Sequence, residues 1–507
     1  MVAFGNQQTF TLASQFGRLN YKFMDRYLFT ATVRRDGSSK FYEGNQYGVF
    51  PSGSIAWRAK EEAFLKDVKF ITDLKFRASY GEVGNQAGIR PFQYLARYSS
   101  GGPATSPINV GYPFGGAYQS GLAYVNLDNQ SLTWETSRQT DIGLDAAFLD
   151  GDLSLTLDYY RKDSKDFLLQ IPTASQSGVT NSAQNAGSIR NQGIELGLNY
   201  KHTVNDFTYG LGLNLTTVKN KLLSITKNTN FIGNLVNLTT PANGWLQFSR
   251  TGIGQAVGEF YGYESLGIFQ TQAEIDALNA GAPSGNYQGN SAQRTQPGDR
   301  KFRDVNGDGQ ITADDRTSLG SPIPKFYGGF NLDLAYKGFD FNAFFYGSYG
   351  NKIFNYQARN LESFQAPGFV GIQNVSEEYY RNHWSPTNPS NRYARINYND
   401  DVSANNVASS IYVEDGSYLR LRNVTLGYTL PVAVSQKMTL NRVRLYFAAQ
   451  NLFTITKYSG LDPEIGQPTG TDPNNNNASS NNATASGVDV GTYPSSRFFT
   501  FGLNVTF

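Results

Sequence analysis

The chain has 507 residues, a formal net charge of +2 and 17% charged residues, so it lacks the concentrated positive charge with which proteins bind nucleic acids. It contains no cysteine, which excludes disulfide bonds and thiolate metal sites but is neutral about the cellular compartment. A chain of this length has room for several ordinary domains or for one large barrel.

The amino-terminal residues have no basic segment followed by an apolar one, so we expect no secretory signal there. No run of about 18 apolar residues occurs, so transmembrane helices are not expected either. The mean hydropathy of -0.43 is compatible with membrane-spanning strands, because such strands alternate apolar and polar side chains.

Alternation of this kind recurs along the chain. Leucine or tyrosine occupies every second position in 153–160 (LSLTLDYY) and in 209–216 (YGLGLNLT). A period of two predicts strands that are wetted on one face. The runs extend over about ten residues, which is the length needed to cross a bilayer at a tilt. Strands of soluble sandwiches are usually shorter, with about five or six residues.

We therefore predict an all-β fold, a transmembrane antiparallel up-and-down β-barrel to which this chain contributes about 13 strands. In chain order, the strands are expected at 14–24, 26–36, 47–59, 70–83, 136–149, 151–165, 191–203, 206–219, 326–337, 339–350, 415–430, 440–453 and 497–507.

The connections between these strands alternate in length. Tight turns are expected at 150–151, 203–206, 337–338 and 431–441. Long polar stretches occupy 84–135, 166–190, 221–325, 351–414 and 454–496. Outer-membrane barrels have this asymmetry, with short periplasmic turns and long extracellular loops. We therefore expect the long connection 221–325 to be extracellular and the carboxyl terminus to be periplasmic.

The segment 258–270 (GEFYGYESLGIFQ) has an extended pattern but disturbs this scheme. If it were a spanning strand, the long stretch 271–325 would lie on the side of the short turns. We therefore expect the segment inside the outer loop, in a hairpin with a partner. The alternative is one further strand hidden within 221–257.

The chain ends in RFFTFGLNVTF, residues 497–507. One face of this strand is apolar and consists of Phe499, Phe501, Leu503, Val505 and Phe507. A last strand that is recognised by the insertion machinery and closes a barrel needs such a lipid-facing row. The alternative is a buried edge strand of a soluble sandwich, although a free apolar strand at a terminus promotes aggregation in a soluble protein.

One motif has the spacing of a metal site, DVNGDGQITADD at 304–315. Oxygen-bearing side chains stand at its first, third, fifth and twelfth positions, a glycine at the sixth allows a sharp turn, and the seventh residue offers its carbonyl, as in calcium-binding loops. The expected ligands of a structural Ca2+ are Asp304, Asn306, Asp308, Gln310 and Asp315. Because Asp replaces the usual Glu at the twelfth position, we expect a modest affinity. The alternative is a turn capped by its own Asp and Asn side chains.

Other candidate residues are scattered. His202 and His383 form no ligand cluster, so we interpret them as solvated residues. Trp134, Trp245 and Trp384 are interpreted as membrane-interface or loop-packing residues in preference to sugar-stacking platforms. No nucleophile, base and orienting acid stand together, so we do not expect an enzyme. The ligand-binding residues are unknown from the sequence.

Several longer segments have specific sequences, among them LKFRASYGEVGNQ at 74–86, PGDRKFRDVNGDGQITADDRTSLGSPIPKFYGGF at 297–330 and YLRLRNVTLGYTLP at 418–431. Together with 16–41, 47–66, 134–145, 191–200 and 448–464, they resemble the barrel of SusC/RagA-type TonB-dependent transporters of the Bacteroidota, in order and over essentially the whole chain.

This resemblance implies a barrel of about 22 strands, preceded by a signal peptide, a carboxypeptidase-like extension, a TonB box and a plug domain. The plug and about nine strands would come from a companion chain or from a missing amino-terminal part, because an open sheet in a bilayer leaves unpaired backbone groups that cost several kcal/mol each. The chain is then expected to be one piece of a split transporter, a truncated product or the ordered part of a larger chain.

The resemblance also implies energy-dependent import of oligosaccharides or peptides across the outer membrane. The expected partners are a SusD-like surface lipoprotein, TonB acting through the plug, and outer-membrane lipids; no nucleic acid is expected. The alternative is a structural or interaction subunit of an outer-membrane complex that does not transport.

Overall fold

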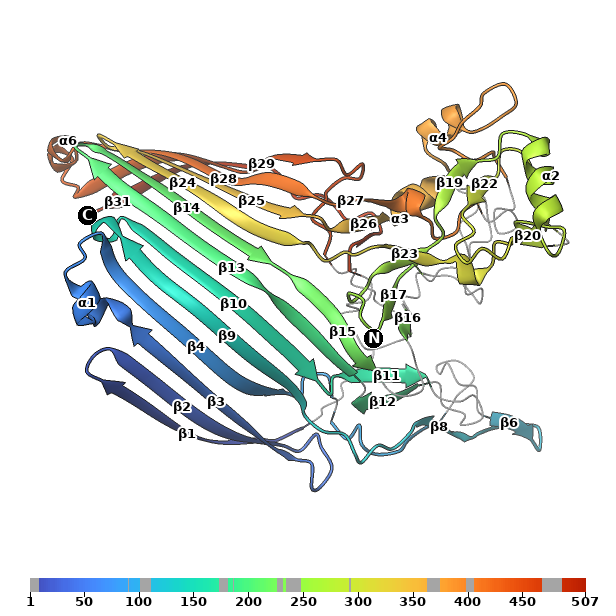
Figure 1. The fold of residues 1–507 in the computed structure, drawn as a ribbon, viewed down its shortest axis with the longest axis horizontal. Coiled ribbons are helices and arrows are strands. Elements are labelled where there is room, and N and C mark those ends of the chain that lie inside the picture. Colours follow the sequence, from blue (N-terminus) through green and yellow to red (C-terminus); the bar gives the residue numbers. More distant parts are fainter. Residues whose placement is uncertain are drawn as a thin grey trace. The chain divides into compact units, whose positions relative to one another are not determined.

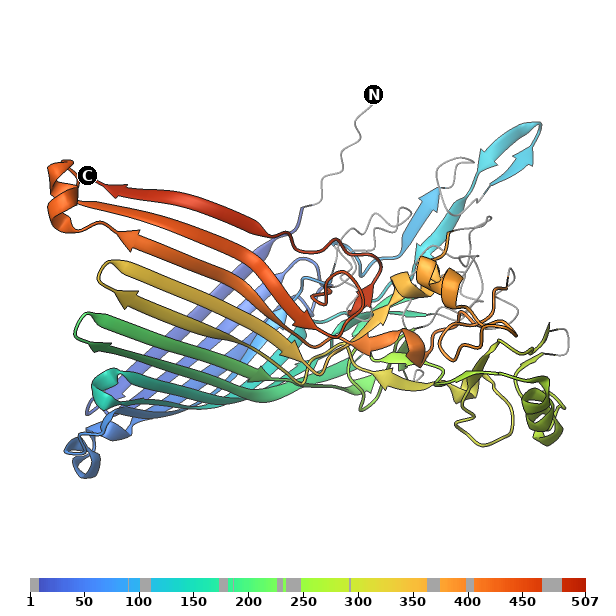
Figure 2. The ribbon, with the colours of Figure 1, turned by 90° about the horizontal axis from the view of Figure 1, so that it is seen from above.

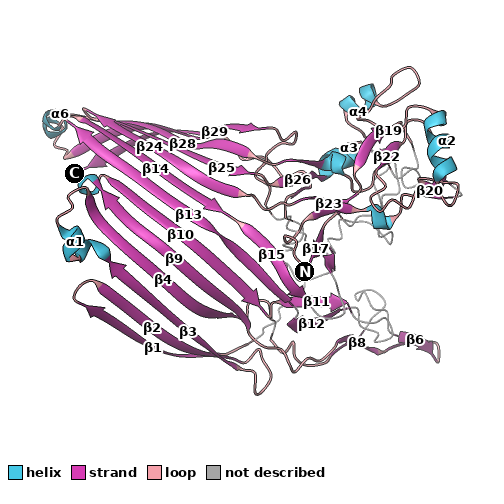
Figure 3. Ribbon diagram, in the orientation of Figure 1, coloured by secondary structure: helices cyan, strands magenta, loops and turns pink. Residues whose placement is uncertain are grey.

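The computed structural model describes residues 9–89, 91–100, 111–172, 181–185, 187–225, 231–233, 248–290, 293–362, 374–397, 405–466 and 486–507. These residues divide into two units, residues 1–202 with 210–230, and residues 203–209 with 231–507. Long strands dominate both units (Figure 1), and helices are short and confined to the connections (Figure 3). In the described part of the chain, no helix has the length and apolar character required to span a membrane.

The first unit contains a series of long antiparallel strands that are neighbours in the sheet in chain order. They are β1 (Leu12–Phe23), β2 (Tyr27–Ser38), β3 (Tyr47–Arg58), β4 (Ile71–Asn85), β9 (Glu135–Phe148), β10 (Leu153–Lys165), β13 (Gly187–Val204) and β14 (Phe207–Thr217), with the tip of the β13–β14 hairpin assigned to the second unit. The strand β15 (Lys219–Ile225) also pairs with β13.

The connections of the first unit contain short elements. The pairs are β5 (Arg97–Ser100) with β8 (Leu122–Asn126), β6 (Gly111–Phe114) with β7 (Ala117–Ser120), and β11 (Leu168–Pro172) with β12 (Asn181–Asn185). The helical turns are η1 (Ala59–Glu61), α1 (Ala63–Lys66) and η2 (Leu149–Gly151). A small core, formed by Phe41, Phe50, Ile89, Leu132 and Trp134, lies in these connections.

The second unit continues the same pattern with β24 (Phe326–Tyr336), β25 (Phe339–Tyr349), β28 (Tyr418–Thr429), β29 (Arg442–Thr456) and β31 (Phe498–Thr506). These strands are antiparallel neighbours in that order. Figure 2 shows the hairpin of β28 and β29 with the helix α6 (Val432–Lys437) at its end.

The long connections of the second unit fold into small elements of their own. The strands are β16 (Phe231–Gly233), β17 (Arg250–Gly252), β18 (Phe260–Gly262), β19 (Ser265–Ile268), β20 (Gly289–Asn290), β21 (Gln293–Arg294), β22 (Arg300–Phe302), β23 (Thr317–Gly320), β26 (Lys352–Asn355), β27 (Val413–Asp415) and β30 (Val488–Asp489). The helices are α2 (Gln272–Gly281), η5 (Ala313–Asp315), α3 (Tyr356–Leu361), α4 (Glu377–Asn382) and η6 (Ser410–Tyr412).

The predicted strands are confirmed. All thirteen long strands occur in the expected order, and most of their ends lie within three residues of the predicted ones. The largest difference at a strand start is in β13, which begins at Gly187 instead of residue 191. The additional residues of β13 pair with β10 on one side and with β15 on the other.

The segment 258–270 lies inside the long connection between β14 and β24, as expected, and it is paired. The segment does not form a simple hairpin with one partner. Its strand β18 pairs with β23, and its strand β19 pairs with β22. Among the described residues, the alternative of a further spanning strand within 221–257 is not seen: β15 (Lys219–Ile225) follows β14 after one residue and pairs with the same neighbour, β13.

Two long strands have a free edge. Among the described residues, β1 pairs only with β2, and β31 pairs only with β29. Every residue of β1 is exposed. Unpaired backbone groups of this kind are not stable in hydrocarbon unless further strands cover them.

Candidate functional site

The terminal strand β31 carries the predicted apolar face. It pairs with β29 in a register that brings Phe501 opposite Phe447, and the two ring centroids lie 4.9 Å apart. Four members of the face are exposed and one is partly buried: Phe499, Phe501, Leu503 and Phe507, and Val505. Phe501 is 82% exposed, so this side of the strand offers a continuous apolar surface.

The opposite face of β31 is shaped by a glycine. A Cβ atom at Gly502 would lie 2.1 Å from Cζ of Tyr446, which is the residue opposite it on β29. The missing side chain therefore lets the Tyr446 ring lie across the terminal strand. The amide of Asn441 donates a hydrogen bond to the carbonyl of Thr506 (2.8 Å), so the chain ends level with the short connection that contains α6.

A cluster of charges lies on the strands of the first unit, on the face opposite the exposed apolar residues. The guanidinium of Arg77 on β4 contacts Asp141 and Asp145 on β9 at 3.2 Å and 3.1 Å, and Asp158 on β10 at 2.6 Å. A Cβ atom at Gly143 would lie 2.6 Å from Cζ of Arg77. Gly143 therefore leaves the space through which the arginine crosses β9 to reach Asp158.

This cluster was not among the sites predicted from the sequence. The alternation along each strand does place these residues on the face opposite the apolar one, so their inward direction was accessible from the sequence. The contacts between Arg77 and the three aspartates were not predictable, because they depend on the register between strands that a long connection separates in the sequence.

The loop 304–315 is folded around its own polar side chains. The carboxylate of Asp304 accepts hydrogen bonds from the amides of Gly307 (2.7 Å) and Gly309 (2.8 Å), and these bonds, that from Gly309 first, hold its pKa below the ordinary value. Asn306 accepts from the amide of Asp308, which accepts in turn from the amide of Gln310. Gly307 and Gly309 have φ angles of 77° and 83°, a conformation that favours glycine.

Asp315 closes this loop from its far end. It is fully buried and accepts hydrogen bonds from the amides of Val305 (2.9 Å) and Thr312 (2.7 Å). In the part of the chain that the structure describes, no three His, Cys, Asp or Glu side chains form a group that could hold a metal ion. The observed hydrogen bonds fit both a self-capped turn and a loop organised in advance for a cation, so calcium binding stays a prediction.

The long connections of the second unit share a core that excludes water. Phe260 and Phe354 are 0% and 1% exposed, and they pack with Phe248, Tyr412 and Val488 from three other segments. The strand β26 pairs with both β27 and β30. Segments that are more than 200 residues apart in the sequence, such as 248 and 488, therefore form one packed loop layer.

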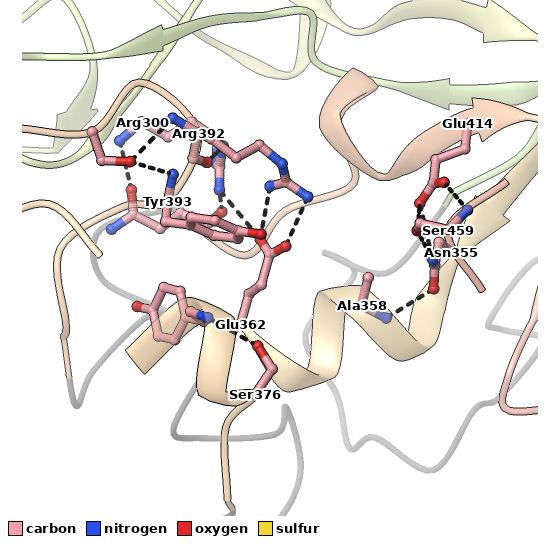
Figure 4. Close-up of polar contacts among 12 residues, drawn as sticks. Arg300, Asn355, Ala358, Glu362, Ser376, Arg392, Tyr393, Glu414 and Ser459 are labelled. Atoms are coloured by element: carbon pink, nitrogen blue, oxygen red, sulfur yellow. Dashed lines mark hydrogen bonds and ion pairs between the residues drawn. The ribbon is translucent and has the colours of Figure 1, made fainter. Parts of the chain in front are cut away.

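Buried charges join further segments of this loop layer (Figure 4). The carboxylate of Glu362, at the end of α3, lies 2.8 Å from Nη2 of Arg392 and 3.8 Å from Nη2 of Arg300. The side chains of Arg300 and Glu362 are 2% and 5% exposed. Burial raises the pKa of Glu362, and the two arginines act in the opposite direction. A buried carboxylate is stable only with such partners.

Two neighbouring contacts extend this network. Asp299 is fully buried and forms an ion pair with Arg395 (2.7 Å). Asn355 caps the first turn of α3 by accepting from the amide of Ala358, and its amide group donates to Glu414. The loop layer is thus held by specific polar contacts as well as by its apolar core.

The remaining predicted residues have structural surroundings. Trp134 is 9% exposed and packs on Phe41 and Phe50 in the loop core of the first unit, which agrees with a packing role. The indole of Trp384 donates to Gln270. His202 contacts Asp152, and His383 contacts the carbonyl of Tyr380. Trp245 lies outside the described residues.

The long antiparallel strands have an exposed apolar face and an opposite face that carries charges. Short and long connections alternate between them. These features define the wall of a transmembrane β-barrel. The sequence of residues 2–263 matches the family described as TonB dependent receptor-like, beta-barrel. The chain belongs to this family of outer-membrane receptors and transporters.

Individual relatives agree with this assignment. TonB-dependent receptor P3 of Formosa agariphila is 39% identical over 503 residues, which are 98% of this chain and 45% of that protein. TonB-dependent receptor SusC of Bacteroides thetaiotaomicron is 30% identical over 505 residues, 98% of this chain and 44% of SusC. The chain therefore spans less than half the length of these relatives.

The fold has a counterpart among solved structures. The structure of the RagAB peptide transporter superposes with a TM-score of 0.74 at 22% sequence identity, and the match covers 98% of this chain and 47% of that one. This likeness supports the barrel architecture of the chain.

Proposed function

We propose that this chain forms part of the barrel wall and outer loops of a TonB-dependent importer in the outer membrane. The observation that carries the proposal is the match of 98% of the chain to 45% of a TonB-dependent receptor, combined with free edges on β1 and β31 among the described residues. The rest of the transporter would supply about nine strands and the plug, and TonB would act through that plug. A SusD-like lipoprotein would cover the outer loops.

The proposed cargo is an oligosaccharide or a peptide. The resemblance of the sequence to SusC/RagA-type transporters implies such a cargo, and the solved structure with a similar fold is that of a peptide transporter. The packed loop layer supports a role of the outer loops in cargo recognition, because loops that pack together hold recognition residues in place more precisely than separate loops would.

Purification of the tagged chain from outer membranes tests this proposal. Native mass spectrometry should detect a plug-bearing polypeptide, or a mass that includes a plug, together with a lipoprotein. Cells that lack the chain should lose uptake of a labelled oligosaccharide or peptide. A complex without a plug and with unchanged uptake would contradict transport and support the alternative of a structural subunit.

We also infer that the loop 304–315 binds Ca2+ in a structural role, with Asp304, Asn306, Asp308, the carbonyl of Gln310 and Asp315 as ligands. The motif spacing supports this inference. The loop also packs closely on the segment after α2, because a Cβ atom at Gly309 would lie 3.2 Å from Cδ of Pro283. A stiffened loop would therefore be anchored against the rest of the loop layer.

Asp304→Ala combined with Asp308→Ala tests the calcium site. The wild-type loop should gain thermal stability on addition of calcium and lose it with a chelator, and the double variant should show neither response. Asp276→Ala on the neighbouring helix α2 is the control, because its side chain lies outside the motif. An unchanged response to chelator in the double variant would reject the site.

A further inference from the structure

In the described part of the chain, two short connections contain an α-helix, whereas the others are tight turns, one of them with the short 3-10 turn η2. The helix α1 lies between β3 and β4, and α6 lies between β28 and β29. Figure 1 shows each helix at the turn end of its own hairpin. By contrast, β24 and β25 are joined by Lys337 and Gly338 alone. Connecting these strands does not require a helix, so the two helices need another explanation.

The connection around α1 presents apolar side chains to its surroundings. Phe64, Val68 and Phe70 are 69%, 38% and 61% exposed. The connection is nevertheless firmly held, because Nζ of Lys60 donates to the carbonyls of Leu65 (3.1 Å) and Val68 (2.8 Å). The aromatic side chains are therefore exposed on a fixed support.

The same connection is tied to the strands beneath it. Glu62, which precedes α1, accepts hydrogen bonds from Nη1 of Arg26 (2.8 Å), the hydroxyl of Tyr27 (2.7 Å) and Nε1 of Trp57 (3.1 Å). Three groups on β2, β3 and the turn between β1 and β2 thus fix the start of the helix. This arrangement holds the exposed phenylalanines at a defined level at the end of the hairpin.

The connection around α6 has the same character. Val432, Val434 and Met438 are 64%, 44% and 52% exposed. Its backbone is closed by a hydrogen bond from the amide of Leu440 to the carbonyl of Ser435 (3.0 Å), and Ser435 is fully buried. The buried side of the helix faces the protein, and its valines and methionine face outward.

Basic residues accompany both apolar surfaces. Lys437 and Arg442 flank Met438, and the sequence from 430 to 443 contains no Asp or Glu. Lys66 and Lys69 flank Val68. Of the three acids in residues 59–70, Glu61 and Glu62 form ion pairs with Arg58 and Arg26, and Asp67 lies between the two lysines. Apolar side chains combined with Lys and Arg are typical of helices that lie in the interface of a membrane, and anionic lipids attract such cations.

The hairpins that carry the helices also have exposed apolar side chains on their strands. On the hairpin that carries α6, Leu426 and Leu445 are 51% and 50% exposed. On the hairpin that carries α1, Ile55 and Phe76 are 60% and 43% exposed. In a barrel wall these outward residues contact lipid, so the helices lie where that surface reaches the headgroup layer.

We propose that α1 and α6 are interfacial anchors: their apolar side chains enter the headgroup layer of the leaflet on the side of the short turns, and Lys437, Arg442, Lys66 and Lys69 bind anionic phospholipid headgroups. The proposal rests on the membrane placement that the proposed function includes. It adds two fixed points that set the height of the barrel wall in the bilayer.

Spin labels on single cysteines test the proposal in the complete transporter, reconstituted in phosphatidylcholine vesicles with and without phosphatidylglycerol. The chain has no native cysteine, so each label is unique. Phe64→Cys and Val434→Cys probe the anchors. Leu426→Cys is the membrane reference, and Asp206→Cys, on the tight turn between β13 and β14 with a side chain that is 64% exposed, is the aqueous reference.

Collision rates with oxygen and with a water-soluble nickel chelate give the depth of each label. The labels at 64 and 434 should lie about 5–10 Å into the interfacial layer, and the label at 206 should lie in water. If the labels at 64 and 434 read as aqueous while the label at 426 reads as hydrocarbon, the anchors are rejected and the membrane placement stands. If the label at 426 is also aqueous, both the anchors and the membrane placement of the strands are rejected.

A charge variant tests the lipid specificity. Phosphatidylglycerol should draw the label at 434 deeper, and Lys437→Gln combined with Arg442→Gln should abolish this shift. Lys337→Gln, on a tight turn without a helix, is the matched control and should leave the shift intact. Equal depth with and without phosphatidylglycerol in the unsubstituted background would overturn the binding of anionic headgroups.

Discussion

Two phenylalanines of the second unit have opposite surroundings. Phe354 in the loop layer is 1% exposed, whereas Phe501 on the terminal strand is 82% exposed. The first is enclosed by protein atoms from several segments, and the second lies on a face that lipid covers in a barrel wall. For these two residues, burial marks the loop layer and exposure marks the wall, which is the reverse of the usual relation between loops and strands.

The buried charges give the most severe way to disturb the loop layer. Glu362→Ala leaves Arg300, whose side chain is 2% exposed, without its acid, and the loss of one partner of a buried pair costs about 3–5 kcal/mol. Hydrogen exchange should accelerate in β22 and α3. The control is Glu377→Ala, whose pair with Arg381 is exposed on both sides and contributes about 0–1 kcal/mol. Equal effects of the two variants would contradict a buried role for Glu362.

The two phenylalanines provide a direct test of the comparison. Phe354→Ala creates a cavity in a closed core and should destabilise the loop layer by about 3–5 kcal/mol. Phe501→Ala leaves no cavity, because lipid fills the space, and should cost clearly less. Limited proteolysis of the loops and heat-dependent mobility of the barrel in gels separate the two effects. If Phe354→Ala leaves the loops as resistant to protease as in the wild type, the stabilising role of the buried Phe354 is contradicted.

A charge on the terminal strand tests which face meets lipid. Phe501→Arg should destabilise the inserted barrel by about 2–4 kcal/mol, depending on depth. Thr500→Arg is the matched control, because residue 500 lies on the opposite face of the same strand. Folded yield in detergent and in vesicles measures both variants. A larger loss for Thr500→Arg would reverse the assignment of the faces.

The smallest expected effect concerns pH. Burial acts to raise the pKa of Asp462, but hydrogen bonds from the amides of Glu464 and Ser495 and the guanidinium of Arg420 outweigh it, so the pKa is lowered. A lowered pKa of an acid stabilises the folded state above the unfolded value, and this contribution disappears as the pH falls through the folded value. Exchange protection near 462 should therefore decline below the ordinary pKa of Asp, and Asp462→Asn should remove that dependence.

The strands were predictable because their signal is local. Alternation along 153–160 and 209–216 depends only on neighbouring residues, and the structure has strands at both places. The start of β13 was missed because Ser188, Ile189 and Arg190, which precede the predicted start, show no apolar alternation. They are extended because β10 and β15 pair with them from both sides, and a single segment does not reveal its neighbours.

The loop layer was not predictable for a related reason. Arg300, Glu362 and Arg392 come from three segments with no common periodicity, and only the folded chain brings them together. The loop 304–315 is the opposite case, since Asp304 accepts from the amides of Gly307 and Gly309, which follow it closely in the sequence. Its turn geometry therefore follows from the sequence.

Arg77 has a mechanical consequence. Its guanidinium joins β4, β9 and β10 at one level of the wall through Asp141, Asp145 and Asp158, and Gly143 leaves room for it to do so. A force that pulls on one of these strands is thus shared by all three. A side chain at position 143 would push the arginine aside and remove this side-chain link, so that only the backbone hydrogen bonds between neighbouring strands would share the load.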